Sequence, residues 1–326
     1  MDKGRRRPPK QRQKLSKKFV VLVFAVVLGF SIWFVSAALG LGDDDGGGTS
    51  GGGGFFGGLS PATVDINLLQ IHSDHANLTY TFSYPGGALD LHRHRIVDPY
   101  YFVDLITYSP RDGVMGIKTH LPVVFDIEYQ RGIVYINVIS PRDIYEHIVI
   151  IDPGHGGADI GAPGPGDVRE SDLVLAISLY LYNLFQTSNS GITAFMTRHD
   201  DSFVAPASRA AFANALGDVF VSVHTNTFAD PSVAGTETLF NPFQNTENIR
   251  LAQIIQNRLV AELGTRDRGI IERTDLYALG TITIPAVFAE IDFKTNPEAL
   301  SNLISSSYQQ RVARALYEGI VYAFNN

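Results

Sequence analysis

Hydrophobic and polar positions alternate through the first folded part of the chain, residues 61–145. Apolar side chains occupy every second position in residues 79–84 and again in residues 123–129. This period of two is typical of half-buried β-strands. Turn signals such as Pro85-Gly86-Gly87 separate the runs, and no stretch has a clear helical period. The pattern predicts a small all-β, sandwich-like domain over residues 61–145.

The spacing changes from Ile148 onward. Continuous apolar runs at residues 148–151, 192–196, 219–223 and 286–289 are typical of strands buried on both faces. Between and after them, apolar residues recur at helical spacing in residues 173–184, 210–216, 251–263 and 312–320. Gly217 and Gly264 follow two of these segments as stop signals. Residues 146–326 are therefore predicted to form a three-layer α/β domain with a mostly parallel central sheet.

The N-terminal segment has the pattern of a membrane anchor. Residues 19–42 contain no charged side chain, and as a helix they would be about 36 Å long, enough to cross a bilayer. A basic tail, residues 1–18, precedes them and Asp43, Asp44 and Asp45 follow, which predicts a single-pass transmembrane helix with the body outside the cell membrane. The alternative is a signal peptide cleaved near Ala37, with secretion of the body. Residues 43–60 are rich in glycine and are expected to form a flexible linker.

The amino-acid composition excludes several kinds of functional site and partner. The 326 residues contain no cysteine, which excludes disulfides, thiolate metal sites and a cysteine nucleophile, so a metal site must use histidine and carboxylate ligands. Nine of the 26 Lys and Arg lie in residues 1–18, leaving 17 against 32 Asp and Glu in the rest. Such an acidic body lacks the clustered basic side chains that bind phosphates, so we expect no nucleic acid partner.

Chemically reactive residues follow three of the predicted strands. The run at 148–151 leads into a glycine-rich stretch containing His155, the run at 219–223 ends at His224, and the run at 286–289 ends at Glu290. Because sites in open α/β sheets form outside the carboxyl ends of the strands, these side chains should converge. Glu170, at the start of the next helix, would complete a set of two histidines and one glutamate. Hydrolytic zinc enzymes use this ligand set and leave the fourth position to water.

Other interpretations of these residues are weaker. Glu170 alone fits the fourth position of a capping box that begins at Asp167, and this role and a ligand role are compatible. The glycine-rich stretch lacks the G-x-x-x-x-G-K-[ST] pattern of a nucleotide loop. Neither an H-E-x-x-H helix nor a G-x-S-x-G elbow is present, which argues against those peptidase and serine hydrolase layouts.

Residues 148–322 resemble the zinc-dependent N-acetylmuramoyl-L-alanine amidases of the bacterial cell wall, the amidase-3 family. The resemblance rests on several long motifs in the right order, among them IVIIDPGHGGADIGAPG, VFVSVHTN and IPAVFAEIDFKTNPEAL. It implies one zinc ion held by His155, Glu170 and His224, with Glu290 as the catalytic glutamate. Asp292 and Gly280 depart from the family pattern, which usually has glycine and often arginine there. Residues 61–145 loosely resemble the AMIN-type modules that target such enzymes to the wall.

The resemblance implies a peptidoglycan hydrolase that cleaves the amide bond between N-acetylmuramic acid and L-alanine by zinc-activated water. Glu290 would act as general base and then return the proton to the leaving amine. Asn226 is expected either to orient a ligand or contact the substrate, or simply to pack its loop. The alternative function is a non-catalytic peptidoglycan-binding or scaffold protein on the same fold.

The expected partners are peptidoglycan and, through the N-terminal helix, the membrane. We expect a monomer that needs no activator protein. The segment between His224 and Glu290 is accounted for by an edge strand at 235–240, a helix at 246–263 and a connection through Gly269. No residues remain for an inserted helix that would cover the site.

Overall fold

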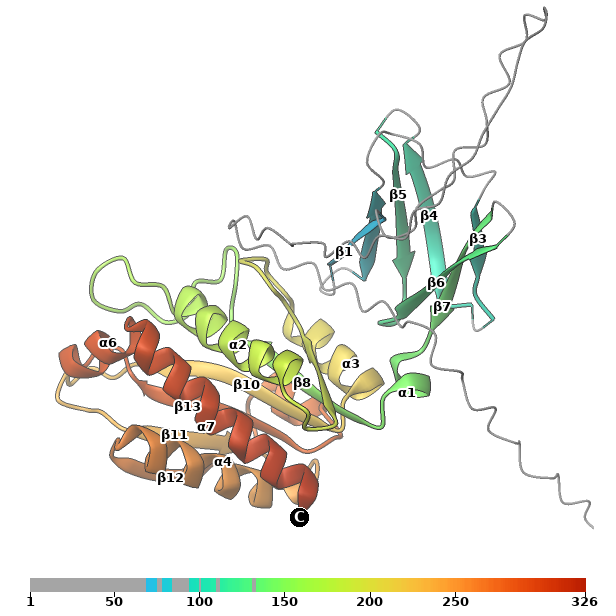
Figure 1. Ribbon diagram of the computed structural model, residues 1–326. Helices are drawn as coiled ribbons and strands as arrows, with labels where there is room; N and C mark the ends of the chain where they lie inside the picture. The colour runs from blue at the N-terminus through green and yellow to red at the C-terminus, as the bar shows by residue number, and fades with distance from the viewer. Residues whose placement is uncertain (1–68, 75–77, 84–93, 100, 110–111, 131–132) are drawn as a thin grey trace, which may run out of the picture.

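The computed structural model describes residues 69–326 except 75–77, 84–93, 100, 110–111 and 131–132. Two folded blocks follow one another along the chain (Figure 1). The predicted basic tail, membrane segment and linker lie outside the described residues. Within the described part of the chain, no helix combines the length and apolar character needed to cross a membrane.

The first block consists of two β-sheets that share one core. The larger sheet has the order β1-β2-β5-β4 and the smaller one β3-β7-β6. The strands are β1 (Gln70–Asp74), β2 (Thr79–Ser83), β3 (His94–Val97), β4 (Val103–Ser109), β5 (Val114–Thr119), β6 (Val124–Gln130) and β7 (Ile133–Ile139). Alternate residues of both sheets face inward, so Phe82 and Ile117 pack in the same cluster as Ile136. All pairs are antiparallel except β3 with β7, which run parallel and depart from the antiparallel pattern expected of a simple sandwich.

The second block is built around a mixed six-stranded sheet. Its order is β12-β11-β13-β10-β8-β9. The strands are β8 (His147–Pro153), β9 (Ile192–Met196), β10 (Val219–Asn226), β11 (Thr236–Phe240), β12 (Asp267–Glu272) and β13 (Ala286–Phe293). β9, β8, β10 and β13 are parallel, whereas β11 pairs antiparallel with β13 and carries β12 alongside it.

This topology corrects one expectation. The segment through Gly269, expected to be a mere connection, forms the edge strand β12, so β11 is an interior strand. A strand paired on one side only needs no continuous apolar run, and the residues of β12 are exposed or half-buried.

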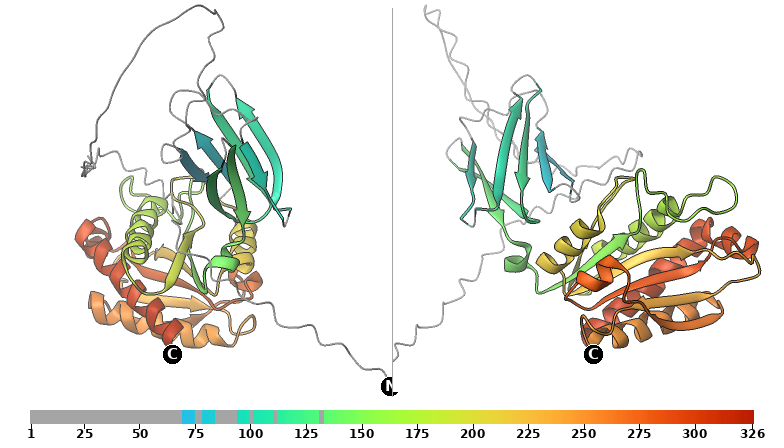
Figure 2. Two further views of the ribbon diagram at one scale, coloured as in Figure 1. Left: turned by 45° about the vertical axis from the view of Figure 1, so that its right-hand side comes forward. Right: turned by 180° about the vertical axis from the view of Figure 1, so that it is seen from behind.

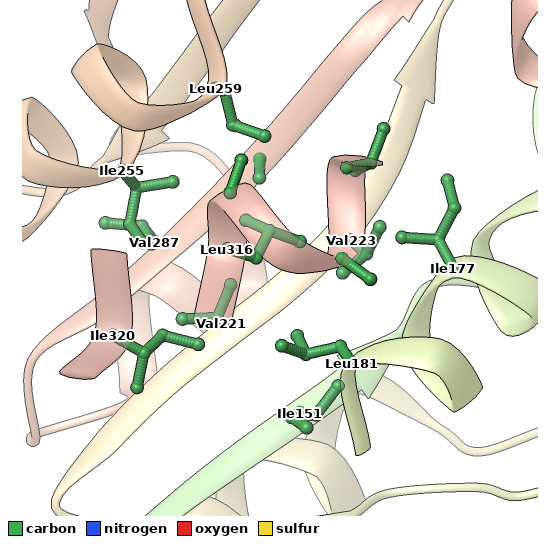
Figure 3. Close-up of a cluster of buried hydrophobic side chains, with 14 of the residues drawn as sticks. Ile151, Ile177, Leu181, Val221, Val223, Ile255, Leu259, Val287, Leu316 and Ile320 are labelled. Atoms are coloured by element: carbon green, nitrogen blue, oxygen red, sulfur yellow. The ribbon is translucent and has the colours of Figure 1, made fainter. Parts of the chain in front are cut away.

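Helices cover both faces of the sheet. α2 (Glu170–Thr187), α4 (Glu247–Leu263) and α7 (Ser306–Asn325) lie on one face, and α3 (Pro206–Leu216) and the short α5 (Tyr277–Thr281) pack on the other (Figures 1 and 2). Two short helices remain, α1 (Pro141–Ile144) between the blocks and α6 (Pro297–Leu303) after β13. Figure 3 shows the first of these cores, with side chains from α2, α4 and α7 against β8, β10 and β13.

Burial on both faces explains the continuous apolar runs. Val149 and Ile151 of β8 point into the first core, whereas Ile148 and Ile150 point into the second. Two buried faces fix the register of the central strands, because a slip by one residue would exchange the faces of every side chain. In this register His224 of β10 lies beside Glu290 of β13.

Candidate metal centre and active site

His155 follows β8 in a loop whose backbone is held by two buried arginines. Arg198 donates hydrogen bonds to the carbonyl oxygens of residues 153 and 154, at 3.0 and 2.6 Å. Arg209 donates to those of residues 153 and 155, both at 2.7 Å. His155 itself has a positive φ of 61°, an uncommon conformation for a residue with a side chain. A Cβ at Gly154 would lie 2.3 Å from the ring of His224, so only glycine lets the two histidines approach.

Three donor atoms converge at the carboxyl ends of β8 and β10. Oε1 of Glu170 lies 3.2 Å from Nε2 of His155 and 3.2 Å from Nδ1 of His224. All three donor atoms lie within 4.8 Å of one another. In a tetrahedral zinc site with bonds of about 2.0–2.2 Å, neighbouring donors lie roughly 3.3–3.6 Å apart. The predicted ligand residues are therefore brought together at a spacing that suits a small divalent metal ion.

The two imidazole rings are fixed by neighbouring groups. Nδ1 of His155 lies 2.9 Å from Oδ2 of Asp159, a carboxylate–histidine pair of the kind that orients metal ligands. The ring of His224 stacks on Phe288 at 5.0 Å between centroids and 6° between planes. The sequence interpretation missed Asp159, although a carboxylate four residues after a glycine-flanked histidine was a signal that could have pointed to it.

Glu170 is bound by donors from three other segments. Its Oε1 accepts a hydrogen bond from the backbone amide of Thr225 at 3.0 Å, and its Oε2 accepts from the amide of Ala162 at 3.2 Å and from Nζ of Lys294 at 3.0 Å. The amide of Thr225 is available because the pairing of β10 with β8 ends at Val223, two residues earlier.

The capping-box interpretation of Glu170 is wrong. Glu170 is the first residue of α2, whose N-cap is Arg169 rather than Asp167 and makes no side-chain cap. The carboxylate of Glu170 accepts from other segments of the chain and not from its own helix.

Electrostatics favour an anion at Glu170. Burial by itself would raise the pKa of Glu170, but the hydrogen bonds and charges of His155 and His224 outweigh it and hold this pKa well below its usual range. For His155, burial would lower the pKa, but Glu170 and Asp159 outweigh it and raise this pKa. Glu170 is therefore ionised, as a carboxylate ligand of a metal ion must be.

The surroundings of Glu290 shift its pKa in the opposite direction to that of Glu170. It is flanked by His224 of β10 on one side and by Glu237 of β11 on the other. Its Oε2 is buried and has no hydrogen-bond partner among the described residues. Burial raises the pKa of Glu290 to about 7, and the nearby carboxylates of Glu170 and Glu237 add to the rise. A carboxyl group with this pKa can take up and release a proton near neutral pH.

Asn226 is bound into a network on the neighbouring strands. Its Nδ2 donates to Oε1 of Glu237 at 2.8 Å, and its Oδ1 accepts from the amide of Thr227 at 2.7 Å. Glu237 also accepts from Nε of Arg268 at 2.8 Å. Both ends of the Asn226 amide are therefore engaged within the protein, which favours the packing alternative over a contact with substrate.

Comparison with known proteins agrees with this geometry. Residues 149–322 match the family model described as N-acetylmuramoyl-L-alanine amidase. An uncharacterized Bacillus subtilis (strain 168) protein, YqiI, is 41% identical over 174 residues, which cover 53% of this chain and 82% of that protein. The N-acetylmuramoyl-L-alanine amidase LytC of the same organism is 34% identical over 53% of this chain, and the match spans only 34% of its own length.

Solved structures give the same result for the second block. An N-acetylmuramoyl-L-alanine amidase from Clostridium difficile 630 superposes with a TM-score of 0.53 and 31% identity, over 55% of this chain and 97% of that one. The CwlD amidase from Clostridioides difficile, solved in complex with the GerS lipoprotein, gives a TM-score of 0.51 and 29% identity, over 55% of this chain and 99% of that one.

Proposed function

The chain belongs to the N-acetylmuramoyl-L-alanine amidase family, as its motifs predicted, and from this premise we propose that it hydrolyses the amide bond between N-acetylmuramic acid and L-alanine in peptidoglycan. We propose that His155, Glu170 and His224 hold one zinc ion for this reaction. The observation that carries the proposal is the convergence of these three donors beside Glu290.

The donor set suits zinc. Two imidazole nitrogens and one carboxylate oxygen are borderline ligands of the type that zinc prefers, and three protein ligands leave a position open for chemistry. When bound there, zinc would polarise the scissile carbonyl and lower the pKa of a water molecule toward about 7.

Glu290 is proposed to move the proton. In its ionised form it accepts a proton from the attacking water, and in its neutral form it returns that proton to the departing amine of L-alanine. A pKa of about 7 serves both steps, because neither form is strongly favoured near neutral pH. A general base of this kind is typically worth about 10²–10⁴-fold in rate.

The rival proposal is a non-catalytic peptidoglycan-binding protein. Oε2 of Glu290, which is buried and has no partner in the described part of the chain, argues against it, because burying a polar atom without a hydrogen bond destabilises the fold. A binding module would gain nothing from keeping such a group, whereas a general base needs it.

A digestion experiment tests the reaction. Purified peptidoglycan is incubated with the full chain, and the products are analysed by mass spectrometry. Amidase activity gives new L-alanine N-termini with intact glycan strands. EDTA should abolish this product and added zinc should restore it. The Glu290→Gln variant should be at least about 10²-fold slower, while Glu318→Gln, an exposed position on α7, serves as the matched control.

Different results would refute the amidase proposal and the role of Glu290. Cut glycan strands, altered D-alanine content, or no product from a zinc-loaded sample would refute the amidase proposal. A Glu290→Gln variant with more than a tenth of the wild-type activity would refute the role of Glu290 alone.

We further propose that location, rather than an inserted plug, controls the enzyme. Residues 227–285, which connect β10 to β13, contain β11, α4, β12 and α5, and Ala278 and Leu279 of α5 lie in the second core rather than over the donors. The chain would then act as a monomer on wall near the membrane to which residues 19–42 anchor it. Digestion without any added partner, and retention of the full chain in the membrane fraction after alkaline washing, are the expected results. Activity that required a second protein would contradict this proposal.

A further inference from the structure

A buried lysine lies behind the metal-ligand candidates. Lys294 comes directly after β13, and its side chain is 0% exposed. Its Nζ lies 3.0 Å from Oε2 of Glu170, which is itself 2% exposed. Among the described residues, this carboxylate is the one acceptor of Nζ. An ammonium group in the protein interior is costly unless it is paired, so the position of Lys294 depends on Glu170.

The loop after β8 closes over this pair. Gly161 has a φ of +80°, and a Cβ there would lie 2.6 Å from Oε2 of Glu170. A Cβ at Gly164 would lie 3.2 Å from Cδ of Lys294. The two glycines therefore let the backbone cover the ion pair closely and exclude water from it. The two oxygens of the Glu170 carboxylate have different neighbours. Oε1 lies beside the two histidines and Oε2 lies beside Lys294.

We propose that Lys294 is a positioning residue that acts on the metal site through Glu170. Its positive charge stabilises the buried carboxylate of Glu170 through Oε2 when no metal is bound. The inference rests on the proposed function, in which these three residues hold zinc.

The charge of Lys294 acts in opposite directions on the two states of the site. In the metal-free protein it stabilises the buried carboxylate, so removing it should destabilise the fold. If His155, Glu170 and His224 hold zinc, the same positive charge on the far side of the Glu170 carboxylate would repel the ion. Because zinc affinity is the difference between the loaded and the metal-free state, a neutral residue at position 294 should make zinc bind more tightly.

Opposite effects on the stability of the metal-free protein and on its zinc affinity distinguish the proposal from a purely structural role of Lys294. A residue that merely packs behind the site would, when replaced, lower both the stability of the metal-free protein and its zinc affinity. Replacing Lys294 by a neutral residue should lower the stability of the metal-free protein and raise its zinc affinity.

The test uses the full chain, purified in detergent, with Lys294→Met and with Lys118→Met as the matched control. Lys118 is an exposed residue of β5 in the first block. Thermal unfolding after EDTA treatment measures the stability of the metal-free protein, and competition with a chromophoric chelator measures the zinc dissociation constant. We expect Lys294→Met to lower the midpoint of unfolding and to lower the zinc dissociation constant by about tenfold. Lys118→Met should change neither.

A second variant keeps the test decisive if Lys294→Met does not fold. Lys294→Gln retains a donor for Oε2 but removes the charge, so it should also bind zinc more tightly than the wild type. An unchanged or higher zinc dissociation constant in the folded variant would overturn the role of Lys294 while leaving the proposed function intact. A wild-type chain that binds no zinc would overturn both.

Discussion

Replacing Glu290 by glutamine should stabilise the metal-free protein at alkaline pH, although it removes the proposed general base. The reason is the burial of the carboxyl group beside other carboxylates, with Oε2 lacking any hydrogen-bond partner among the described residues. Ionising this group costs more in the folded protein than in the unfolded chain. Glutamine keeps the shape of the side chain and never ionises.

The magnitude follows from the pKa. Burial raises the pKa of Glu290 from 4.5 to about 7. At pH values below 4.5 both the folded and the unfolded state hold the proton, and the group has no effect on stability. As the pH rises, the unfolded chain ionises first, so the free energy of unfolding falls until the folded state ionises as well at about pH 7. The cost above that pH is about 3 kcal/mol, and Glu290→Gln should recover most of it.

Urea unfolding of the EDTA-treated full chain at about pH 4 and about pH 8 measures this difference. The control is Glu318→Gln, since Glu318 is exposed and lies 3.7 Å from Arg258, a surface pair expected to matter little. The reasoning fails if Glu290→Gln is no more stable than the wild type at the higher pH, or if its gain is the same at both pH values. Added zinc should shrink the gain, because a nearby cation favours the ionised carboxylate.

Three further outcomes are expected. His155→Ala and His224→Ala should each lose most of the bound zinc in elemental analysis while Glu318→Gln keeps it, and full occupancy in either alanine variant would exclude that residue as a ligand. Zinc affinity measured by chelator competition should fall with decreasing pH, because a protonated imidazole cannot bind the metal; since the pKa of His155 is raised above the ordinary value of 6.5, the fall should begin above that pH, and a pH-independent affinity would contradict this. Arg209→Lys should lower the free energy of unfolding by about 2–4 kcal/mol in urea, because lysine cannot reach Asp152 and the loop carbonyls together; a loss well below 1 kcal/mol would show that the loop does not depend on this arginine.

The sequence predicted the main elements of the second block because their signals are local. A strand buried on both faces needs a continuous apolar run, and a helix packed on a sheet needs apolar residues at a period near 3.6, so β8, β10 and β13 and the helices α2, α4 and α7 could be located. The rule that sites form at the carboxyl ends of strands then placed His155, His224 and Glu290 at one edge. The edge strand β12 carried no such signal, and the sequence did not predict it.

The groups that hold the site in place could not be found in the same way. Lys294 and Glu170 are 124 positions apart, and Arg209 is 57 positions from Asp152, its buried partner. A charged residue in a sequence is expected at the surface, and only its tertiary neighbours make burial tolerable. Which charges are buried is therefore a property of the assembled fold and not of any local pattern.

Two carboxylates of the site, Glu170 and Glu290, differ in what surrounds them, and this difference supports the two proposed roles independently of any resemblance. Glu170 projects from the start of a helix into a region where backbone amides are free, and donors bind both of its oxygens, so it remains an anion suited to hold a cation. Glu290 projects from β13, an interior strand whose neighbours on both sides use the backbone amides, and its Oε2 has no donor among the described residues. Its raised pKa suits a group that exchanges protons rather than one that binds a metal ion. When titratable groups of one type have their pKa values pushed apart by their environments, the environments identify the acid–base partner. We propose Glu290 as that partner in this protein, and the distinction from Glu170 depends on the supply of hydrogen-bond donors at each position of the fold.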